Sequence, residues 1–133
     1  MQGHRIRSGS SFESLVGYSR AAVEGRHVHV SGTTGFDYAS MRIDPDPQAQ
    51  ARQCFRNIAA ALQQAGASLD DVIRVRYLLT DAALFEQLAP VVAEHLGRAA
   101  PAATAMVVGL VDARMHVEIE VTAVIPDKSG QYA

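Results

Sequence analysis

The sequence has few cysteines, which could cross-link the fold, and few large aromatic residues. It has one cysteine and no tryptophan, and aromatic residues make up 6% of its 133 positions. A lone cysteine cannot form an internal disulfide, so the fold must rest on its apolar core, which suits a reducing compartment. Cys54 lies within an apolar helical pattern, and we therefore expect it to have a packing role and not a nucleophilic one.

Long hydrophobic runs are also missing. No stretch approaches the roughly 20 apolar residues that cross a bilayer. Arg5 and Arg7 near the N-terminus are not followed by the apolar segment of a signal peptide. These absences predict a soluble protein in the cytoplasm, with no membrane partner.

Positive charge is neither abundant nor clustered. The formal net charge is −2, and the arginines are dispersed along the chain, so nucleic acid is not the expected partner. His27 and His29 share one face of an expected strand, but no acidic or cysteine ligand follows at a suitable spacing. We therefore predict no metal site and no cofactor.

Apolar residues, at 48% of the chain, are numerous enough for one core. We predict a single domain over residues 1–126, followed by a patternless and mobile tail at 127–133. Two helices are expected within it. Asp46 and Pro47 begin the first and Gly66 ends it. Its buried stripe is expected to comprise Ala51, Cys54, Phe55, Ile58, Leu62 and Ala65.

The second helix is expected to begin at a cap by Asp81 and to run to about Leu96, with Gly97 as its stop. Pro90 would lie inside it, so we expect a bend near Ala89. Its buried stripe is expected to comprise Phe85, Leu88, Val92 and Leu96.

Alternation predicts the strands. Residues 18–22 and 27–31 form an early hairpin around a turn at 23–26, and residues 72–79 form a middle strand with Ile73, Val75, Tyr77 and Leu79 on one face. Residues 101–124 form two alternating runs joined by a short turn. The resulting order ββαβαββ predicts an α+β fold with one mixed sheet and both helices on one face.

The last run places a polar row on one side of its strand, formed by His116, Glu118, Glu120 and Thr122. A row of this kind is most often a solvated sheet face. The alternative is that it borders a cleft, in which case a carboxylate is available for acid or base work.

The order of several short motifs resembles the RidA/YjgF family of small imine and enamine deaminases. The motifs are Gly17-Tyr18, Gly25, Ser31-Gly32, Pro101-Ala102-x-Thr104 and the Val-Glu-Ile-Glu run at 117–120. The resemblance covers nearly the whole chain. It implies the fold described above, a homotrimer, and small-molecule pockets between neighbouring subunits.

The resemblance also implies the site residues. Glu118 would be catalytic, and Tyr18, Ser31, Ala103 and Thr104 would contact substrate. The family usually carries a carboxylate-binding arginine at the position of Ala103, so the resemblance implies a divergent member that lacks this arginine. Arg114 is the nearest replacement in sequence, although an arginine in a turn is usually solvated.

Three functions remain open at this stage. The first is hydrolytic deamination of an imine, an enamine or a related electrophile, with a preference other than the usual 2-aminoacrylate-type substrates. The second is a metabolite-binding trimer without turnover. The third is an endoribonuclease that uses His27, His29 and His116. It has the weakest support, because no basic stripe accompanies these histidines.

Overall fold

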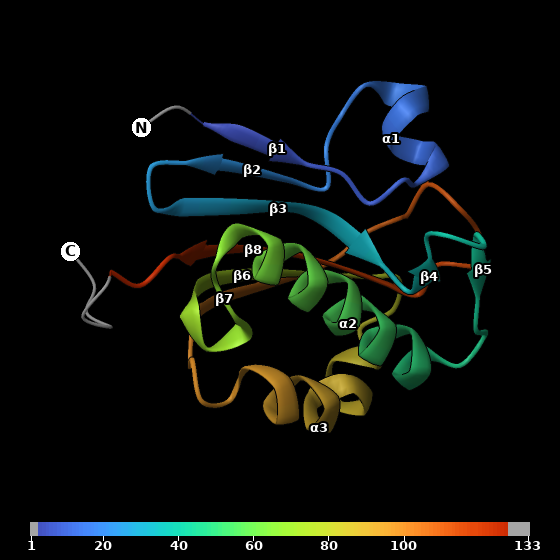
Figure 1. Ribbon diagram of the computed structural model, residues 1–133. Helices are drawn as coiled ribbons and strands as arrows, with labels where there is room; N and C mark the ends of the chain where they lie inside the picture. The colour runs from blue at the N-terminus through green and yellow to red at the C-terminus, as the bar shows by residue number, and fades with distance from the viewer. Residues whose placement is uncertain (1–2, 128–133) are drawn as a thin grey trace.

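A six-stranded mixed sheet dominates the computed structural model, which describes residues 3–127 (Figure 1). Its strands are β1 (His4–Ile6), β2 (Ala21–Glu24), β3 (His27–Thr34), β6 (Val72–Leu79), β7 (Ala102–Val107) and β8 (Val117–Val124). A separate ribbon pairs β4 (Phe36–Asp37) with β5 (Arg42–Ile43). All of the expected mobile tail except Asp127 lies outside the described residues.

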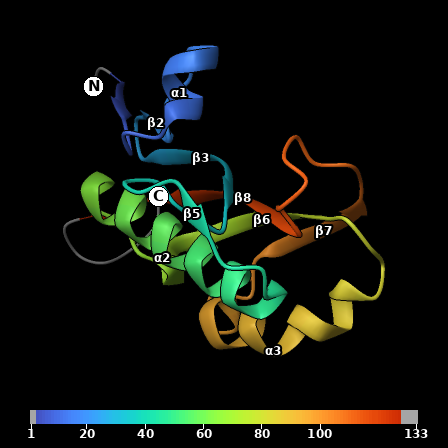
Figure 2. The ribbon, with the colours of Figure 1, turned by 90° about the vertical axis from the view of Figure 1, so that its right-hand side faces the viewer.

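Three α-helices accompany the sheet, namely α1 (Ser11–Val16), α2 (Pro47–Ala65) and α3 (Leu84–Leu96), and a short 3-10 helix, η1 (Leu69–Asp71), precedes β6. Helices α2 and α3 cover one face of the sheet, whereas α1 stands beyond the edge formed by β1 and β2 (Figures 1 and 2). The expected α+β fold with one mixed main sheet is confirmed.

The strand order is β1-β2-β3-β8-β6-β7. The pair β6–β7 is parallel and every other pair in this sheet is antiparallel. The two closing strands, β7 and β8, are not neighbours in the sheet, because β6 lies between them. Helix α3 is the crossover of a parallel β6-α3-β7 unit, which forces β7 to the outer edge.

The N-terminal region differs from its expected form. Tyr18 was expected to begin a strand, but it follows α1, and β2 begins only at Ala21. Ser10 and Glu13 form a capping box that stabilises α1, and Gly17 ends this helix in the left-handed conformation at φ 88°. Elements as short as β1, α1, β4 and β5 carry too few residues to show a period in sequence.

Helix α2 matches its prediction from end to end. The Asp46 side chain accepts a hydrogen bond from the backbone N–H of Ala49 at 2.9 Å, Pro47 is the first helical residue, and Gly66 adopts φ 86° at the C-cap. Five of the six stripe residues are buried, and Ala65 is half-buried. Capping and a 3.6-residue period agree here, so local and tertiary preferences point to one structure.

Helix α3 packs with a different stripe. The buried residues are Leu84, Leu88, Val91 and Leu96. Phe85 was expected inside but is 58% exposed, and Val92 is only half-buried. The prediction that Asp81 caps this helix is wrong: the helix begins at Leu84 with Ala83 at its N-cap, and Asp81 accepts from the N–H of Ala83 at 2.8 Å in the preceding turn. Pro90 lies inside the helix as expected.

Strand β6 also departs from simple alternation near its start. Its register against β8 shifts between Val72 and Arg74, and Ile73 at this irregularity is 48% exposed. Val75 and Leu79 are buried as predicted and Tyr77 is half-buried. A bulge adds one residue to one strand, so residues before it point to the other face.

A buried glutamine joins three segments at one end of the molecule. The side-chain amide of Gln50 on α2 donates to the carbonyl oxygens of Asp44 and Arg114, both at 2.8 Å. Its side-chain oxygen accepts from the N–H of His116, also at 2.8 Å. Gln50 is fully buried, and these three hydrogen bonds satisfy side-chain polar atoms that water cannot reach.

Candidate functional site

A cleft lies on the sheet face that α2 and α3 leave uncovered. It has a volume of about 450 Å³ and is formed by α1, the loop after it, the end of β3, β8 and the segment before β8. It is lined by Phe12, Val16, Tyr18, Ser31, Gly32, Thr34, Tyr38, Val111, Met115, Glu118 and Glu120. The fold thus brings together three of the residues that the sequence singled out, Tyr18, Ser31 and Glu118.

Glu118 is one of two carboxylates in this lining, with Glu120. It lies between Thr34 of β3 and Leu78 of β6 in the sheet register, and its side chain is half-buried. Burial raises the pKa of Glu118, the charge of Glu120 raises it further, and Arg20 partly opposes this rise. A carboxylate with a raised pKa holds a proton more readily, which suits a group that accepts and returns protons.

Gly32 allows this carboxylate to lie against the backbone of β3. A Cβ added at Gly32 would lie 2.7 Å from the Cδ atom of Glu118 and 2.9 Å from one of its oxygens. Side-chain atoms do not approach so closely without moving. The absence of a side chain at position 32 therefore sets where the Glu118 carboxylate lies.

Ser31 and Tyr18 border the same cleft from two connected segments. The Ser31 hydroxyl donates to the carbonyl of Ser19 at 2.6 Å, and the N–H of Ser31 donates to the carbonyl of Arg20 at 2.9 Å. These bonds tie the loop that carries Tyr18 to β3, the strand that carries Ser31. The hydroxyl of Tyr18 lies 3.5 Å from a guanidinium nitrogen of Arg20.

Arg20 is the residue of this region that the sequence did not reveal. It is 1% exposed, and one guanidinium nitrogen donates to the carbonyl of Gly32 at 2.8 Å and to the hydroxyl of Thr33 at 3.2 Å. Its carbon Cζ lies 4.3 Å from the centre of the Tyr38 ring. Arg20 thus supports the floor of the cleft from behind, although it does not line it.

The charge of Arg20 has a buried partner in Glu13, whose carboxylate lies 3.8 Å from the guanidinium. Glu13 also accepts hydrogen bonds from the N–H groups of Ser8 and Ser10 and from the Ser8 hydroxyl. The Nε of Arg20 is buried and has no hydrogen-bond partner among residues 3–127. The only sequence signal was an arginine directly before an apolar strand, and such residues are usually exposed.

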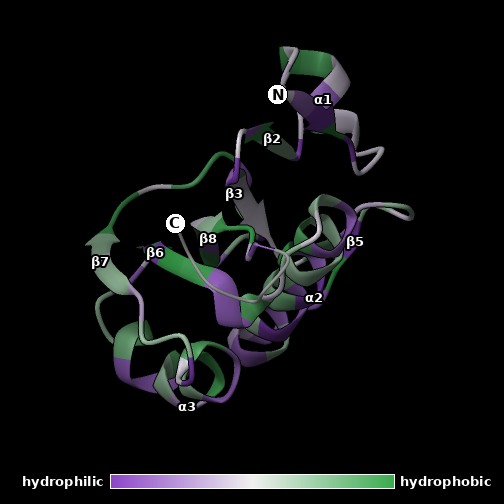
Figure 3. Cartoon of the chain, turned by 60° about the vertical axis from the view of Figure 1, so that its left-hand side comes forward, coloured by the Kyte–Doolittle hydropathy of each residue, from purple (hydrophilic) through white to green (hydrophobic). Residues whose placement is uncertain are grey.

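Ala103 and Thr104 do not reach this cleft within the protomer. They lie on β7, all of whose residues are exposed, and β6 separates that strand from β8. Figure 3 shows this outer strand as mostly hydrophobic. The cleft residues and the β7 residues therefore form two separate surfaces of one protomer.

Arg114 lies near the cleft but is not part of its lining. Its guanidinium makes two hydrogen bonds to the carboxylate of Asp112, at 3.0 and 2.8 Å, and this pairing lowers the pKa of Asp112 to about 2. Within the described chain, no arginine or lysine lines the cleft, whereas two glutamates do. The cleft lining therefore offers no cation to an anionic group.

No group of three or more potential metal ligands comes together within residues 3–127. Over the same residues, no helix has both the length and the apolar character required to cross a lipid bilayer. His27 and His29 stack on the exposed side of β3, with ring centres 6.3 Å apart, and neither lines the cleft.

Comparisons with known proteins point to one family. The family model described as Endoribonuclease L-PSP matches residues 8–125. A crystal structure of Rv2704 from Mycobacterium tuberculosis, described as a member of the YjgF/YER057c/UK114 family, has a TM-score of 0.85 at 39% identity. That match covers 93% of this chain and 100% of the other.

Curated relatives give the same picture. RutC family protein PH0854 from Pyrococcus horikoshii is 36% identical, covering 80% of this chain and 85% of its own. The 2-iminobutanoate/2-iminopropanoate deaminase of Rattus norvegicus is 29% identical, covering 90% of this chain and 89% of its own. The similarity to both relatives thus extends over most of each chain.

Proposed function

Since this chain belongs to the YjgF/RidA family, which the Endoribonuclease L-PSP model represents, we propose that it hydrolyses the C=N bond of a small imine. An enamine would be a substrate through its imine tautomer. The proposal places the reaction in the cleft lined by Tyr18, Ser31 and Glu118. The observation that carries it is the half-buried Glu118 carboxylate in the lining of that cleft, whose pKa burial raises.

In this mechanism Glu118 acts on water. The carboxylate accepts a proton as the water oxygen attacks the imine carbon, which gives a carbinolamine. The imine enters protonated on nitrogen, so the carbinolamine formed in this step is neutral. Glu118 then returns the proton to the nitrogen, and the carbinolamine hydroxyl gives its own proton to Glu118 as the C–N bond breaks. A carbonyl compound and ammonia leave, and the proton left on Glu118 passes to the ammonia, which departs as ammonium. Tyr18 and Ser31 would hold the ligand, and the contact between Gly32 and Glu118 would fix the attacking geometry.

The charges of the cleft support a substrate preference different from that of 2-aminoacrylate-type compounds. Those substrates carry a carboxylate, but the lining offers Glu118 and Glu120 and no cation among the described residues. Leaving a substrate carboxylate without its charged partner costs about 2–5 kcal/mol of binding free energy. We therefore expect a preferred substrate that lacks a carboxylate.

We further propose that three copies assemble and that the pocket is completed at a subunit boundary. Two features of the protomer support this. Among residues 3–127, no strand pairs with the outer side of the edge strand β7. Exposed apolar side chains such as Val107 on β7 and Val111 in the cleft lining also remain uncovered. In such an assembly, Ala103 and Thr104 of one copy would face the cleft of the next, where Ala103 supplies no charge.

The test compares wild type with Glu118→Gln on imines generated in solution, with and without a carboxylate. We expect Glu118→Gln to lower the hydrolysis rate at least about 100-fold, since general base catalysis is worth 10²–10⁴-fold. Gly32→Ala should lower it as well, because its new Cβ displaces the Glu118 carboxylate. Ser14→Ala is the control, as Ser14 is exposed and outside the cleft lining. Equal rates for Glu118→Gln and wild type would refute the mechanism.

A binding protein without turnover is the alternative that one observation favours. Because no cation lines the cleft within the described chain, much of the orientation that a charged clamp gives a substrate is missing. Ligand that raises the melting temperature and is recovered unchanged would support this alternative. Detection of ammonia above the uncatalysed rate would exclude it.

A further inference from the structure

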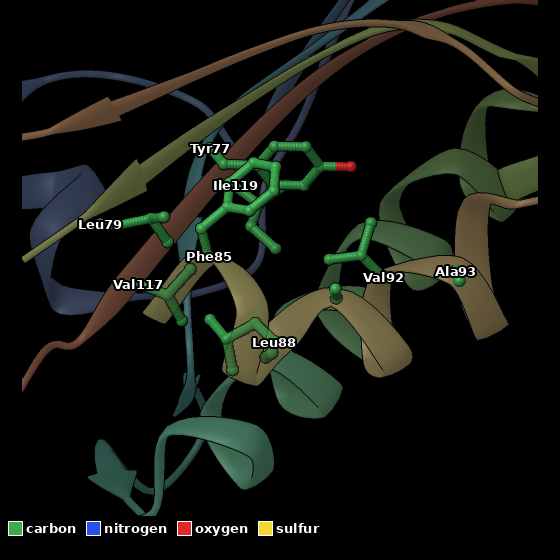
Figure 4. A pocket seen from close by; sticks show the side chains of 10 residues that line it. Tyr77, Leu79, Phe85, Leu88, Val92, Ala93, Val117 and Ile119 are labelled. Carbon is green, nitrogen blue, oxygen red and sulfur yellow. The ribbon is translucent and has the colours of Figure 1, made fainter. Parts of the chain in front are cut away.

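A second pocket lies on the opposite face of the sheet from Glu118, between α3 and strands β6 and β8 (Figure 4). Its volume is about 170 Å³. It is lined by Ala51, Tyr77, Leu79, Phe85, Leu88, Ala89, Val92, Ala93, Val117 and Ile119. This pocket shares no residue with the cleft, so its ligand need not be the substrate.

The chemistry of the lining is almost wholly apolar. The hydroxyl of Tyr77 is the only side-chain polar group, since every other lining residue is alanine, valine, leucine, isoleucine or phenylalanine. Burial raises the pKa of Tyr77 to about 12, so the phenol stays uncharged at neutral pH. An ordered water requires two to four polar partners, which this lining cannot supply.

The packing of α3 keeps the pocket unfilled. This helix packs against the sheet through Leu84, Leu88 and Val91. In that orientation Phe85 is left 58% exposed. Val92, on the same side as Phe85, is only half-buried. Figure 4 shows Phe85 and Leu88 from the helix and Tyr77 and Val117 from the sheet as the labelled walls of this pocket. An aromatic side chain in the wall of the pocket and partly at the surface gives an apolar ligand both contact area and a route of entry.

We propose that this pocket is a binding site for one small uncharged apolar molecule about the size of a benzene ring, either aromatic or branched aliphatic. Its size fits, because an engineered apolar cavity of about 150 Å³ in another protein stays dry and binds benzene. Its chemistry fits too, because a carboxylate or an ammonium group would lose its hydration and find no charged partner. The Tyr77 hydroxyl can hydrogen-bond to one polar atom of the ligand.

The test uses toluene and its charged analogue benzoate as probes of the full-length protein. Methyl resonances of Val92, Val117 and Ile119 report on the pocket walls. We expect toluene to shift them saturably and benzoate to bind at least ten times more weakly. Failure of toluene to shift these methyl groups, or equal binding of the two probes, would overturn the proposal.

A matched pair of variants on the same helix separates the pocket from the surface. Ala89→Leu adds three carbon atoms at a lining position and should weaken toluene binding at least tenfold, whereas Gln87→Leu should leave it unchanged because Gln87 is exposed and outside the lining. Unfolding curves of both variants show whether each is folded. If Ala89→Leu binds toluene as tightly as wild type does, the proposal is wrong. It is also wrong if this substitution changes the oligomeric state, since that would mean that another copy of the chain fills the pocket.

Discussion

Glu118 and Ile119 are consecutive residues of β8, yet they line pockets of opposite character on the two faces of one sheet. Glu118 points into a cleft whose lining includes two carboxylates, three hydroxyl groups of tyrosine and serine, and a threonine. Ile119 is fully buried and lines a pocket with a single polar side-chain group. The strand period of two produces this contrast within about 3.4 Å of chain.

The two faces are stabilised in different ways. On the helix-covered face, β8 contributes Val117, Ile119 and Val121 to a continuous apolar core. Near the cleft, one buried cation, Arg20, satisfies backbone and side-chain oxygens and pairs with Glu13. The core therefore tolerates gradual changes of size, whereas the support of the cleft depends on one charge.

Removal of the buried cation should have the largest effect. Arg20→Met leaves the Glu13 carboxylate buried without its partner, and breaking a buried ion pair in this way costs about 3–5 kcal/mol. Arg20→Lys should recover part of this loss. Urea unfolding at fixed protein concentration measures both variants, with Arg98→Met as the exposed control. A loss below about 1 kcal/mol for Arg20→Met would show that the cleft does not depend on this charge.

Truncation on the apolar face should come next. Ile119→Ala removes buried methyl groups beside an existing pocket, and such changes cost about 2–5 kcal/mol of unfolding free energy. The value should fall toward the lower end of that range, because the neighbouring pocket already limits the packing contacts of this side chain. Ile73→Ala on β6 is the matched control, since Ile73 is 48% exposed. Equal losses for the two variants would contradict the burial of Ile119.

The charge of Glu118 should affect stability in a manner that depends on pH. Its pKa is raised in the folded protein, mainly by burial, so the folded state favours the protonated acid. This contribution is present below the ordinary pKa near 4.5 and is lost as pH rises through the folded value. Glu118→Gln should therefore gain stability relative to wild type as pH rises through that window. A difference that does not change between acidic and neutral pH would contradict this prediction.

The smallest effect is expected for the ion pair on the open face. Arg76 and Glu120 lie 3.1 Å apart, with side chains 41% and 37% exposed. Water and salt screen such a pair, so Arg76→Ala should cost no more than about 1 kcal/mol. Urea unfolding at low ionic strength and at 1 M salt should show a difference that disappears with salt. A large loss that persists at high salt would indicate that this face is more enclosed than one protomer shows.

Sequence patterns predicted α2 fully because its signals are redundant. Asp46, Pro47 and Gly66 each mark a boundary by local chemistry, and the stripe between them has one reading. Helix α3 carries two competing apolar stripes. Leu84, Leu88 and Val91 follow the three- and four-residue spacing of a helix, and so do Phe85, Leu88 and Val92. Only packing against the sheet decides which set is buried, and packing cannot be read from spacing alone.

The cleft shows a similar division. Tyr18, Ser31 and Glu118 could be predicted because their motifs follow one another in a recognisable order, and the fold gathers them. Arg20 could not, because a charged residue is normally assigned to the surface and its burial depends on Glu13, seven residues earlier in the chain. The roles assigned to all of these residues remain predictions, and Ala103, Thr104 and Arg114 also lie outside the cleft lining of the protomer.

Gln50 has a consequence for which side chains of β8 line the cleft. Its side chain accepts the N–H of His116 just before β8 begins, so the helix determines the residue at which this strand enters the sheet. A slip of one position along β8 would turn Ile119 toward the cleft and Glu118 toward the core. The side chain of Gln50, 68 residues away from Glu118 in sequence, thus helps to fix the register of β8, with Glu118 on the cleft face and Ile119 on the core face.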